Sequence, residues 1–286
     1  MQILEKFRID GKVCIVTGAA QGLGVVFSEA LAEAGADLVI VTDKQVSKLQ
    51  GVAETISEKT GREVLPLNVD VTSEIDVTNM VAKAIDRFGR IDVIVNNVGI
   101  VLSKPAIELS LEEWERVLKV NLTSVFLCSK AVGKQMIEKG VKGNIINISS
   151  GYGEVVDLVP NSPYYASKSA VIHLTKALAC EWGHLGIRVN ALCPGWFPTP
   201  MGGSLHKNEM WVRHMHSKIP LGRLGKFNDL KPIIVFMASD ASEYISGHVF
   251  EALGGPVEMA EPMGTGLKYL ADLYSENYIK PFRFIR

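Results

Sequence analysis

Residues 13–24 read VCIVTGAAQGLG, a short apolar run followed by three glycines. The run Val13–Thr17 is rich in β-branched side chains, which favour a strand. Gly18 permits a tight turn, and Leu23–Ala34 carries apolar residues at helical spacing before Gly35, a residue that suits a helix C-terminus. The stretch therefore predicts a strand, a glycine turn and a helix in direct succession.

The same order of elements continues along the chain. Further runs that we interpret as strands are Leu38–Thr42, Glu63–Asn68, Asp92–Asn96, Asn144–Ser149, Arg188–Leu192 and Gly247–Glu251. They are almost continuously apolar, as expected of parallel strands that helices cover on both faces. We therefore predict an α/β fold, a doubly wound (Rossmann) sheet of seven parallel strands with right-handed crossovers in a single domain.

Two segments depart from this alternation. Residues 1–255 are expected to form one domain, since no repeat or linker divides them. Within it a long helix is predicted to open at Ser110, where residues 110–113 fit a capping box. Residues 194–224 are rich in Pro, Gly, Met, His and Trp with weak periodicity, and we interpret them as a mobile substrate lid. Residues 256–286 form a C-terminal extension.

The composition limits the class of protein. The chain has 286 residues, 47% of them hydrophobic, and a formal net charge of -1 without a basic block, which argues against nucleic acid or an anionic membrane as partner. The N-terminus lacks the layout of a signal peptide, and no apolar stretch is long enough to span a bilayer. The cysteines lie in apolar segments and form no C-x-x-C, so we expect core thiols and a cytoplasmic location: Cys14, Cys128, Cys180 and Cys193.

The glycine turn suits a dinucleotide. Gly22 would let the backbone approach a pyrophosphate at the helix N-terminus, where free N–H groups and the helix dipole favour anions. Asp43 ends the second strand, nineteen residues beyond Gly24, where a carboxylate would bond the adenosine ribose hydroxyls and repel the 2′-phosphate of NADP. Lys44 could offset that repulsion, whereas Gln21 adds no positive charge. We predict NAD rather than NADP.

A second motif suits proton transfer. Tyr164 and Lys168 lie four residues apart, on one face of a predicted helix, and the positive charge of the lysine would favour the phenolate of a side chain whose ordinary pKa is about 10. The Ser149–Ser150 pair ends a predicted strand upstream and could deliver a hydroxyl to the same crevice. Tyr165 is excluded as the base, since no lysine follows it at the fourth place.

In these motifs the chain resembles the short-chain dehydrogenase/reductase family, in its single-domain, NAD(P)-dependent branch. The resemblance covers about residues 11–255. The matching elements are the TGxxxGxG loop at 17–24, Asp70-Val71, the Asn-Asn-x-Gly at 96–99, Asn121, Ser150, Tyr164 with Lys168, and Pro194-Gly195 followed by Thr199. Two residues depart from the family pattern: Val98 replaces a common alanine beneath the cofactor, and Leu253 replaces a common aspartate before Gly254-Gly255.

The resemblance implies a role for each matching residue. The catalytic set would be Asn121, which holds a proton-relay water, Ser150, which polarises the substrate oxygen, Tyr164 as acid/base, and Lys168, which binds the nicotinamide ribose and lowers the tyrosine pKa. Asp70 would bond the adenine amino group, Asn96 would lie by the adenosine ribose and Thr199 by the carboxamide. The full set expected to bind the cofactor is Gly18, Gln21, Gly22, Leu23, Gly24, Asp43, Asp70, Val71, Asn96, Gly99, Tyr164, Lys168, Pro194, Gly195 and Thr199.

The sequence predicts an oxidoreductase that interconverts a secondary alcohol and its ketone. A polyol, sugar or sugar acid is favoured because the predicted lid carries polar and basic residues, the basic ones being His206, Lys207, Arg213, His214 and Lys218. A hydrophobic alcohol of the steroid or terpenoid kind is the alternative, and a 3-oxoacyl thioester reductase is the third. The apolar lid residues support the hydrophobic alcohol: Trp196, Phe197, Met201, Met210 and Trp211. A nucleotide-binding regulatory protein without catalysis is the rival from another class. The histidines His214 and His216 lack a third ligand, so no metal is expected.

The extension 256–286 carries five aromatic residues, with Lys280, Arg283 and Arg286 among them. Leu267, Leu270, Leu273 and Tyr274 recur at helical spacing, which favours a short amphipathic helix. The family resemblance implies a homo-oligomer, a tetramer or a dimer, so we expect the extension to pack on another subunit. There an aromatic side chain, Arg283 or Arg286 would reach the rim of that subunit's substrate pocket.

Overall fold

The computed structural model describes residues 2–157 and 159–255, and these contain one seven-stranded sheet in the order β3-β2-β1-β4-β5-β6-β7. Every neighbouring pair of strands is parallel. The strands are β1 Val13–Thr17, β2 Leu38–Asp43, β3 Glu63–Asn68, β4 Val93–Asn96, β5 Asn144–Ile148, β6 Arg188–Pro194 and β7 Val249–Ala252. The doubly wound sheet predicted from the sequence is confirmed, with strand ends that differ by at most two residues.

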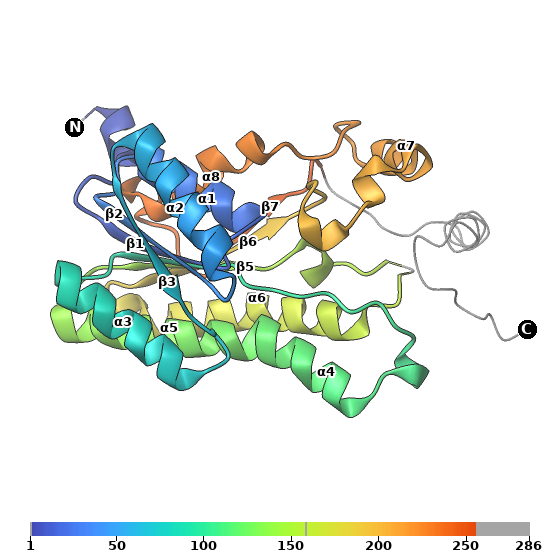
Figure 1. Cartoon of the computed structure of the whole chain (residues 1–286), viewed down its shortest axis with the longest axis horizontal. Helices are drawn as coiled ribbons and strands as arrows, with labels where there is room; N and C mark the ends of the chain where they lie inside the picture. The colour runs from blue at the N-terminus through green and yellow to red at the C-terminus, as the bar shows by residue number, and fades with distance from the viewer. Residues whose placement is uncertain (1, 158, 256–286) are drawn as a thin grey trace, which may run out of the picture.

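Helices cover both faces of the sheet (Figure 1). Figure 1 shows α1, α2 and α8 on one face and α3, α4, α5 and α6 on the other, as in three-layer α/β folds. Their bounds are α1 Leu23–Glu33, α2 Val46–Thr60, α3 Glu74–Phe88, α4 Leu111–Leu118, α5 Ser124–Lys139, α6 Ser162–Trp182, α7 Glu209–Lys218 and α8 Lys231–Ala238. The remaining helix, α7, lies beyond the sheet in the segment interpreted as a lid.

The two faces have separate apolar cores. Phe27 and Leu31 of α1 pack with Ile234 of α8 on one side, and Met80 of α3 packs with Met136 of α5 on the other. All five residues of β1 and all five of β5 are buried, which explains why β1 is almost wholly apolar and why the two asparagines of β5 form hydrogen bonds inside the fold. The sheet is therefore rigid where its central strands end.

The strand order reverses at β1, which lies between β2 and β4. In open parallel sheets the crossover connections diverge at such a point and leave a crevice beyond the carboxyl ends of the strands. The loops after β1, β4, β5 and β6 all begin at this edge. The order of the strands thus brings the glycine turn and the Ser149–Ser150 pair, far apart in sequence, to one side of the sheet.

The helix predicted to open at Ser110 has an irregular middle. The Ser110 hydroxyl accepts the Glu113 N–H while the Glu113 carboxylate accepts the Ser110 N–H, so the capping box is confirmed. After α4 the chain continues as a π-helical turn, Lys119–Thr123, and then as α5. Such turns are rare in proteins as a whole, but those that occur are often at functional sites. This one contains Asn121.

The structure also bears on the cysteines, on membrane spans and on groups of potential metal ligands. Cys14, Cys128 and Cys193 are buried, but Cys180 on α6 is exposed, so the prediction that all four are core thiols is wrong for this one. Between residues 2 and 255, leaving out 158, no helix is long and apolar enough to cross a membrane. The same residues contain no group of three potential metal ligands. The predicted extension 256–286 lies outside the described residues.

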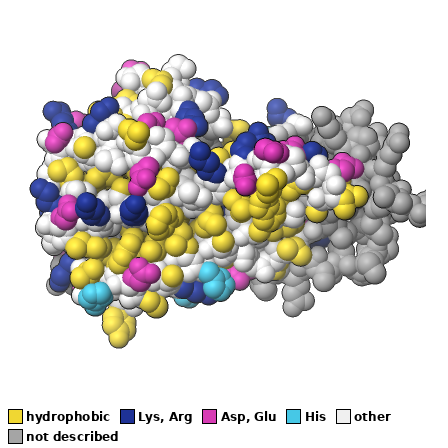
Figure 2. Space-filling view, turned by 90° about the horizontal axis from the view of Figure 1, so that it is seen from below, with side chains coloured by type: hydrophobic (Ala, Val, Ile, Leu, Met, Phe, Trp, Pro, Cys, Tyr) yellow, Lys and Arg dark blue, Asp and Glu magenta, His cyan; other side chains and the backbone are white. Residues whose placement is uncertain are grey.

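Apolar side chains also remain on the surface. Figure 2 views the molecule from below relative to Figure 1, so it shows the face formed by the layer of α3, α4, α5 and α6. On this face apolar side chains are gathered between charged groups. Phe126 and Ile137 of α5 and Leu111 of α4 are among the large apolar side chains that stay exposed. The fold thus leaves part of its apolar surface uncovered, as is common for the surface of a folded chain.

Candidate active site

A cavity of about 910 Å³ opens at the carboxyl edge of the sheet. Its lining comes from the loops after β1, β2, β4, β5 and β6, together with the first part of α6 and one face of α7. The volume is at the upper end of the range for small-molecule sites, so it has room for a cofactor together with a substrate. We call the lining from the strand ends and α6 the floor, and the lining from residues 194–219 the roof.

The glycine loop forms one end of the floor. Gly18 and Gly22 line the cavity and have φ values of +67° and +61°, in the region that favours glycine. Gly22 is the N-cap of α1, so the first backbone N–H groups of that helix face the cavity without side chains in the way. Gly24 is buried within α1, where a methyl group would overlap the Gly18 carbonyl oxygen.

These glycines fit a pyrophosphate. A side chain at Gly22 would point toward Thr199 and Pro200 of the roof and fill the space above the helix N-terminus. The bare backbone there is the kind of cradle that a phosphate needs. Gln21 and Leu23 line the cavity beside it, and so do Pro194, Gly195 and Thr199 across from it.

Asp43 closes the floor at the end of β2. One of its carboxylate oxygens accepts the Ala20 N–H (3.2 Å) and the other accepts the Gln45 N–H (3.0 Å). Lys44, in contrast, directs its ammonium to Asp70 Oδ2 (2.6 Å). Burial opposes ionisation of Asp70, but Lys44 and the bonds from Thr72 outweigh it and lower the pKa of that carboxyl. The positive charge that could offset Asp43 is thus paired with another carboxylate.

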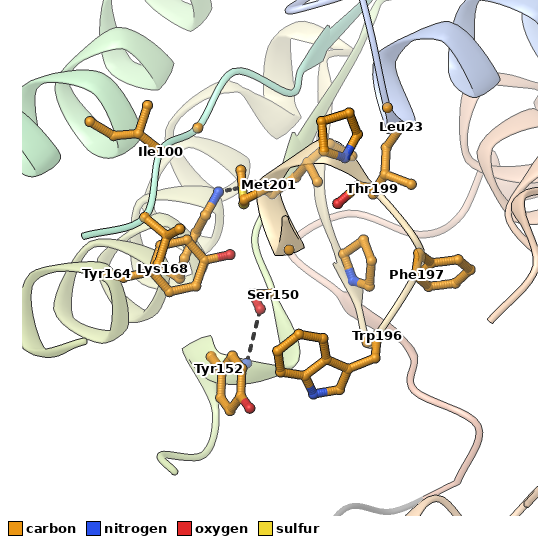
Figure 3. A pocket seen from close by; sticks show the side chains of 18 of the residues that line it. Leu23, Ile100, Ser150, Tyr152, Tyr164, Lys168, Trp196, Phe197, Thr199 and Met201 are labelled. Carbon is orange, nitrogen blue, oxygen red and sulfur yellow. Dashed lines mark hydrogen bonds between the residues drawn. The ribbon is translucent and has the colours of Figure 1, made fainter. Parts of the chain in front are cut away.

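Ser150, Tyr164 and Lys168 meet in the middle of the floor (Figure 3). Tyr164 and Lys168 lie one turn apart on α6, and Ser150 follows β5. The Ser150 hydroxyl accepts the Tyr152 N–H (3.1 Å) and interacts with the Tyr164 phenol. Ser149 instead donates its hydroxyl to the Lys168 carbonyl (2.7 Å), a bond that ties α6 to β5. Ser150 is therefore the serine that can reach a substrate beside the phenol.

The lysine is buried beneath the tyrosine. Lys168 is 3% exposed, and its Nζ donates to the Ile148 carbonyl (2.8 Å) and lies 5.8 Å from the centre of the Tyr164 ring. Burial is the main influence on its pKa and lowers it from 10.5 to about 8. The ammonium is thus held at the cavity with donors to spare, because one bond to a carbonyl uses only one of its three hydrogens.

The pKa of Tyr164 differs from the sequence-based expectation. Burial raises it, and the Ser150 hydroxyl acts in the opposite direction. Lys168 was expected to lower it, but the ammonium, 5.8 Å from the ring centre, is not among the groups that shift this pKa. Tyr164 is therefore a neutral phenol at neutral pH.

Asn121 holds the loop after β4 rather than lining the cavity. Its side chain is fully buried, with Oδ1 accepting the Ile100 N–H (2.8 Å) and Nδ2 donating to the Ile100 carbonyl (2.9 Å) and to Ser167 Oγ (3.1 Å). A Cβ placed on Gly99 would lie 3.6 Å from Asn121 Oδ1 and 3.5 Å from Lys168 Nζ. The π-helical turn thus brings Asn121 to Lys168 around a glycine.

Three residues predicted to bind the cofactor lie elsewhere. The Asn96 side chain is 2% exposed and donates to Ser129 Oγ (3.0 Å) and Asn147 Oδ1 (2.8 Å) inside the sheet, because it points into the α5 and α6 side, while Asn97 lines the cavity. Asp70 is held by Lys44 and does not line the cavity, although Val71 does. Gly24 serves helix packing. The part of these three residues in binding a cofactor stays a prediction.

The roof is an aromatic wall followed by one face of α7. The Trp196 ring lies 5.9 Å from the Tyr152 ring and 4.9 Å from the Trp211 ring, edge to face in both pairs. Trp211, Met215 and Ile219 form the small apolar cluster that attaches α7. His214 and Lys218 line the cavity from the same face of α7.

Sequence reasoning missed part of the substrate end. Tyr152 and Asp157 line the cavity just beyond Ser150, and the Tyr152 hydroxyl donates to Asp157 Oδ2 (2.9 Å). Ser103 and Asn161 line it as well and are joined by a 2.5 Å hydrogen bond. None of the four belongs to a periodic pattern. The one available signal was their position in loops that follow strands β4 and β5.

Comparison with known proteins agrees with this geometry. A family model described as "Enoyl-(Acyl carrier protein) reductase" matches residues 18–256. The chain is 39% identical over 256 residues to the 2-dehydro-3-deoxy-D-gluconate 5-dehydrogenase of Dickeya dadantii, covering 88% of this chain and 98% of that protein. It is 37% identical over 250 residues to the 3-oxoacyl-[acyl-carrier-protein] reductase FabG of Thermotoga maritima, covering 87% and 99%.

A solved structure matches equally well. The gluconate 5-dehydrogenase of Burkholderia cenocepacia, in complex with NADP and tartrate, superposes with a TM-score of 0.84 at 32% identity. The match covers 89% of this chain and 98% of that one. The similarity thus covers most of both chains, and it is close enough in sequence to concern more than the fold.

Proposed function

Since the chain belongs to the short-chain dehydrogenase/reductase family, we propose that it interconverts a secondary alcohol and its ketone, with Tyr164 as the acid/base and NAD(H) as the hydride carrier. The observation that supports this most is that Ser150, Tyr164 and Lys168 line the same cavity as the bare glycine loop. A dinucleotide held by that loop would extend along the floor toward the phenol. Bound nicotinamide would supply the hydride chemistry.

The chain's own residues handle the proton. In ketone reduction the neutral Tyr164 phenol donates its proton to the carbonyl oxygen, and Ser150 donates a hydrogen bond to the same oxygen as negative charge develops. In alcohol oxidation the phenol must first lose its proton, which burial opposes and the hydrogen bond with Ser150 favours. The raised pKa of Tyr164 keeps the phenol protonated at neutral pH, which is the form that ketone reduction needs.

Lys168 and Asn121 support this transfer. The Lys168 ammonium has hydrogens left to bond a ribose hydroxyl after its bond to Ile148. The Asn121 amide is occupied by Ile100 and Ser167, so we assign it the positioning of Gly99 beside the ammonium. If Asn121 holds a relay water, the water must bond to its backbone, because the side-chain amide is already bonded. The π-helical turn changes which backbone carbonyls accept hydrogen bonds within the helix.

We propose NAD as the preferred cofactor. Asp43 lines the cavity at the end of β2, where its carboxylate would face the adenosine ribose, and Lys44 is drawn away by Asp70. A 2′-phosphate would therefore meet a carboxylate without a free ammonium close by in sequence. The gluconate 5-dehydrogenase of Burkholderia cenocepacia was solved with NADP. The proposed preference for NAD therefore rests on Asp43 and on the pairing of Lys44 with Asp70 in this chain.

For the substrate we propose a polyol, sugar or sugar acid. The substrate end of the cavity carries hydrogen-bonding side chains of both polarities: Asp157, Asn161, Ser103, His214 and Lys218. A polyhydroxylated molecule can form hydrogen bonds with such groups, whereas a hydrocarbon would remove water from them without offering any hydrogen bond in return. The relative from Dickeya dadantii acts on a sugar acid according to its name, in agreement with this proposal.

A hydrophobic secondary alcohol is the second candidate. The aromatic contacts of Trp196 with Tyr152 and Trp211 form a continuous wall at the substrate end. Such a wall would bury a flat apolar ring system well, although aromatic rings also pack against the C–H faces of sugars. The two candidate substrates differ in their contacts with the polar side chains around the wall: a sugar or polyol would form hydrogen bonds with them, and an apolar alcohol would not.

The test is turnover measured by NADH absorbance. Purified protein should be assayed with NAD and NADP against polyols, sugar acids, cyclic apolar alcohols and 3-oxoacyl thioesters, in both directions. We expect turnover of polyols or sugar acids, with NAD preferred over NADP by at least about tenfold in kcat/KM. Activity confined to apolar alcohols would support the second candidate. Absence of turnover in every class, with intact NADH binding, would contradict the proposed function.

A further inference from the structure

The inner face of α7 carries two basic side chains. Trp211, His214, Met215 and Lys218 line the cavity at a spacing that places them on one face of the helix, and Ile219, which directly follows α7, lines it as well. Trp211, Met215 and Ile219 are buried and anchor the helix, while His214 and Lys218 are half-buried among them. The basic residues on the other faces, Arg213 and His216, are exposed. The position of His214 and Lys218 at the cavity thus follows from helix geometry.

From this arrangement we infer that His214 and Lys218 form a carboxylate-binding subsite, so that the substrate is an open-chain hydroxy acid. Resting on the proposed function, this inference narrows its substrate class. Residues four apart on a helix have Cβ atoms about 5–6 Å from each other, so both side chains can reach the two oxygens of one carboxylate. Hydrogen bonds from charged donors to a carboxylate are stronger than neutral ones.

Asp157 determines which end of the substrate lies at α7. Its carboxylate lines the same cavity and is oriented by the Tyr152 hydroxyl, next to the catalytic Ser150. The pKa of Tyr152 is raised by burial and by Asp157, so the phenol stays a neutral donor to that carboxylate. Asp157 would repel an acid group and accept hydrogen bonds from hydroxyls. The hydroxyl-bearing end is therefore placed at Asp157 and the acid group at α7.

The aromatic wall connects these two ends. Trp196 contacts Tyr152, the partner of Asp157, on one side and Trp211 of α7 on the other. A chain of carbon atoms that runs along the indole would have its carboxylate at His214 and Lys218 and its hydroxyls near Asp157 and Ser150. The reacting hydroxyl then lies several carbons from the acid group, which is the pattern of an aldonic acid or its deoxy keto derivative rather than of a simple 2-hydroxy acid.

The matched pair D-gluconate and D-glucitol tests this inference, because the two differ only in a carboxylate against a terminal alcohol. Binding to the enzyme–NADH complex is measured by calorimetry, and turnover with NAD by absorbance. We expect the wild-type protein to bind gluconate at least about tenfold more tightly than glucitol, a difference of about 1.4 kcal/mol. Lys218→Met and His214→Gln should each reduce this preference, and the double variant should abolish it.

Two control variants remove the same charges from the outer side of α7. Arg213→Gln and His216→Gln lie on exposed faces and should keep the preference for gluconate within about twofold of the wild type. NADH affinity should be unchanged in all variants, which shows that the fold is intact. The inference is overturned if the wild-type protein binds glucitol as tightly as gluconate, if gluconate does not bind, or if the double variant keeps the preference. Oxidation of polyols without any acid preference would overturn this inference alone and leave the proposed function standing.

Discussion

The floor and the roof of the cavity are built in different ways. Floor residues follow buried strands or lie on α6, and they are fixed by short hydrogen bonds such as those from Ser149 to Lys168 and from Lys168 to Ile148. The roof is held by a small apolar cluster around Trp211 and by edge-to-face rings. From this difference we propose that the chemistry depends on the sheet, whereas the choice of substrate depends on the roof, a segment that could change without disturbing the sheet.

Substitution of Lys168 should lower the catalytic rate and raise the free energy of unfolding, because the buried ammonium of the floor destabilises the fold. Lys168→Met should lower kcat by about a hundredfold to a thousandfold, on the scale of acid/base catalysis. It should also stabilise the fold. The folded-state pKa of about 8 lies below the ordinary 10.5, and this difference corresponds to about 3 kcal/mol, less about 1 kcal/mol for the lost bond to Ile148.

The sign of this effect can be checked with pH. Because the folded-state pKa is lowered, the cost of burying the ammonium is present in full below about pH 8 and is relieved as the pH rises toward 10.5. The gain in the free energy of unfolding for Lys168→Met should therefore be about 2 kcal/mol at pH 7 and smaller at pH 9.5, by urea denaturation. Lys176→Met, on the exposed face of α6, is the control and should change neither stability nor kcat. A variant that is less stable than the wild type at pH 7 would contradict the account.

A pair of glycine variants compares the two regions directly. A methyl group at Gly24 in the floor would overlap the Gly18 carbonyl oxygen, whereas one at Gly202 in the roof would meet nothing within 4 Å. Gly24→Ala should displace the glycine loop and weaken NADH binding by at least about tenfold, since overpacking typically costs about 1–3 kcal/mol. Gly202→Ala should change NADH affinity by less than about twofold. Equal effects of the two variants in fluorescence titrations would remove the distinction between floor and roof.

Cofactor choice should give the smallest of these effects. Asp43→Ala removes the carboxylate that would bond the ribose hydroxyls and repel a 2′-phosphate, so it should weaken NAD binding and narrow the gap to NADP by about tenfold. The ratio of kcat/KM for the two cofactors measures this, with an unchanged substrate KM as the control. A wild-type protein that prefers NADPH would show that the pairing of Lys44 with Asp70 does not decide the matter.

The sequence was most informative about the floor. Buried strands such as β1 are recognisable as apolar runs. The glycine loop and Ser150 directly follow such strands, and Tyr164 and Lys168 lie one helical turn apart on α6. Asn96 shows the limit of such motifs. Successive side chains of a strand point to opposite faces of the sheet. The side chain of Asn96 is therefore bonded inside the fold, whereas that of the next residue, Asn97, lines the cavity.

The roof was harder to predict for a physical reason. The inner face of α7 mixes apolar with basic residues, for instance Met215 beside His214, so the helical periodicity of its apolar residues is weak although the helix is present. Asp157 gave no signal at all, because its role depends on a contact with Tyr152 within a loop. The π-helical turn at Asn121 was also missed, since packing rather than local propensity selects it.

The most direct test of the central claim is the effect of Tyr164→Phe on the hydride-transfer rate, measured by single-turnover absorbance with NADH and the best ketone substrate. Removal of the hydroxyl leaves the ring in place, so NADH and substrate affinities should change by less than about threefold. The rate itself should fall by at least about a hundredfold, the usual scale for loss of a general acid. A variant that transfers hydride at a rate close to that of the wild type would contradict the assignment of Tyr164 as the acid/base.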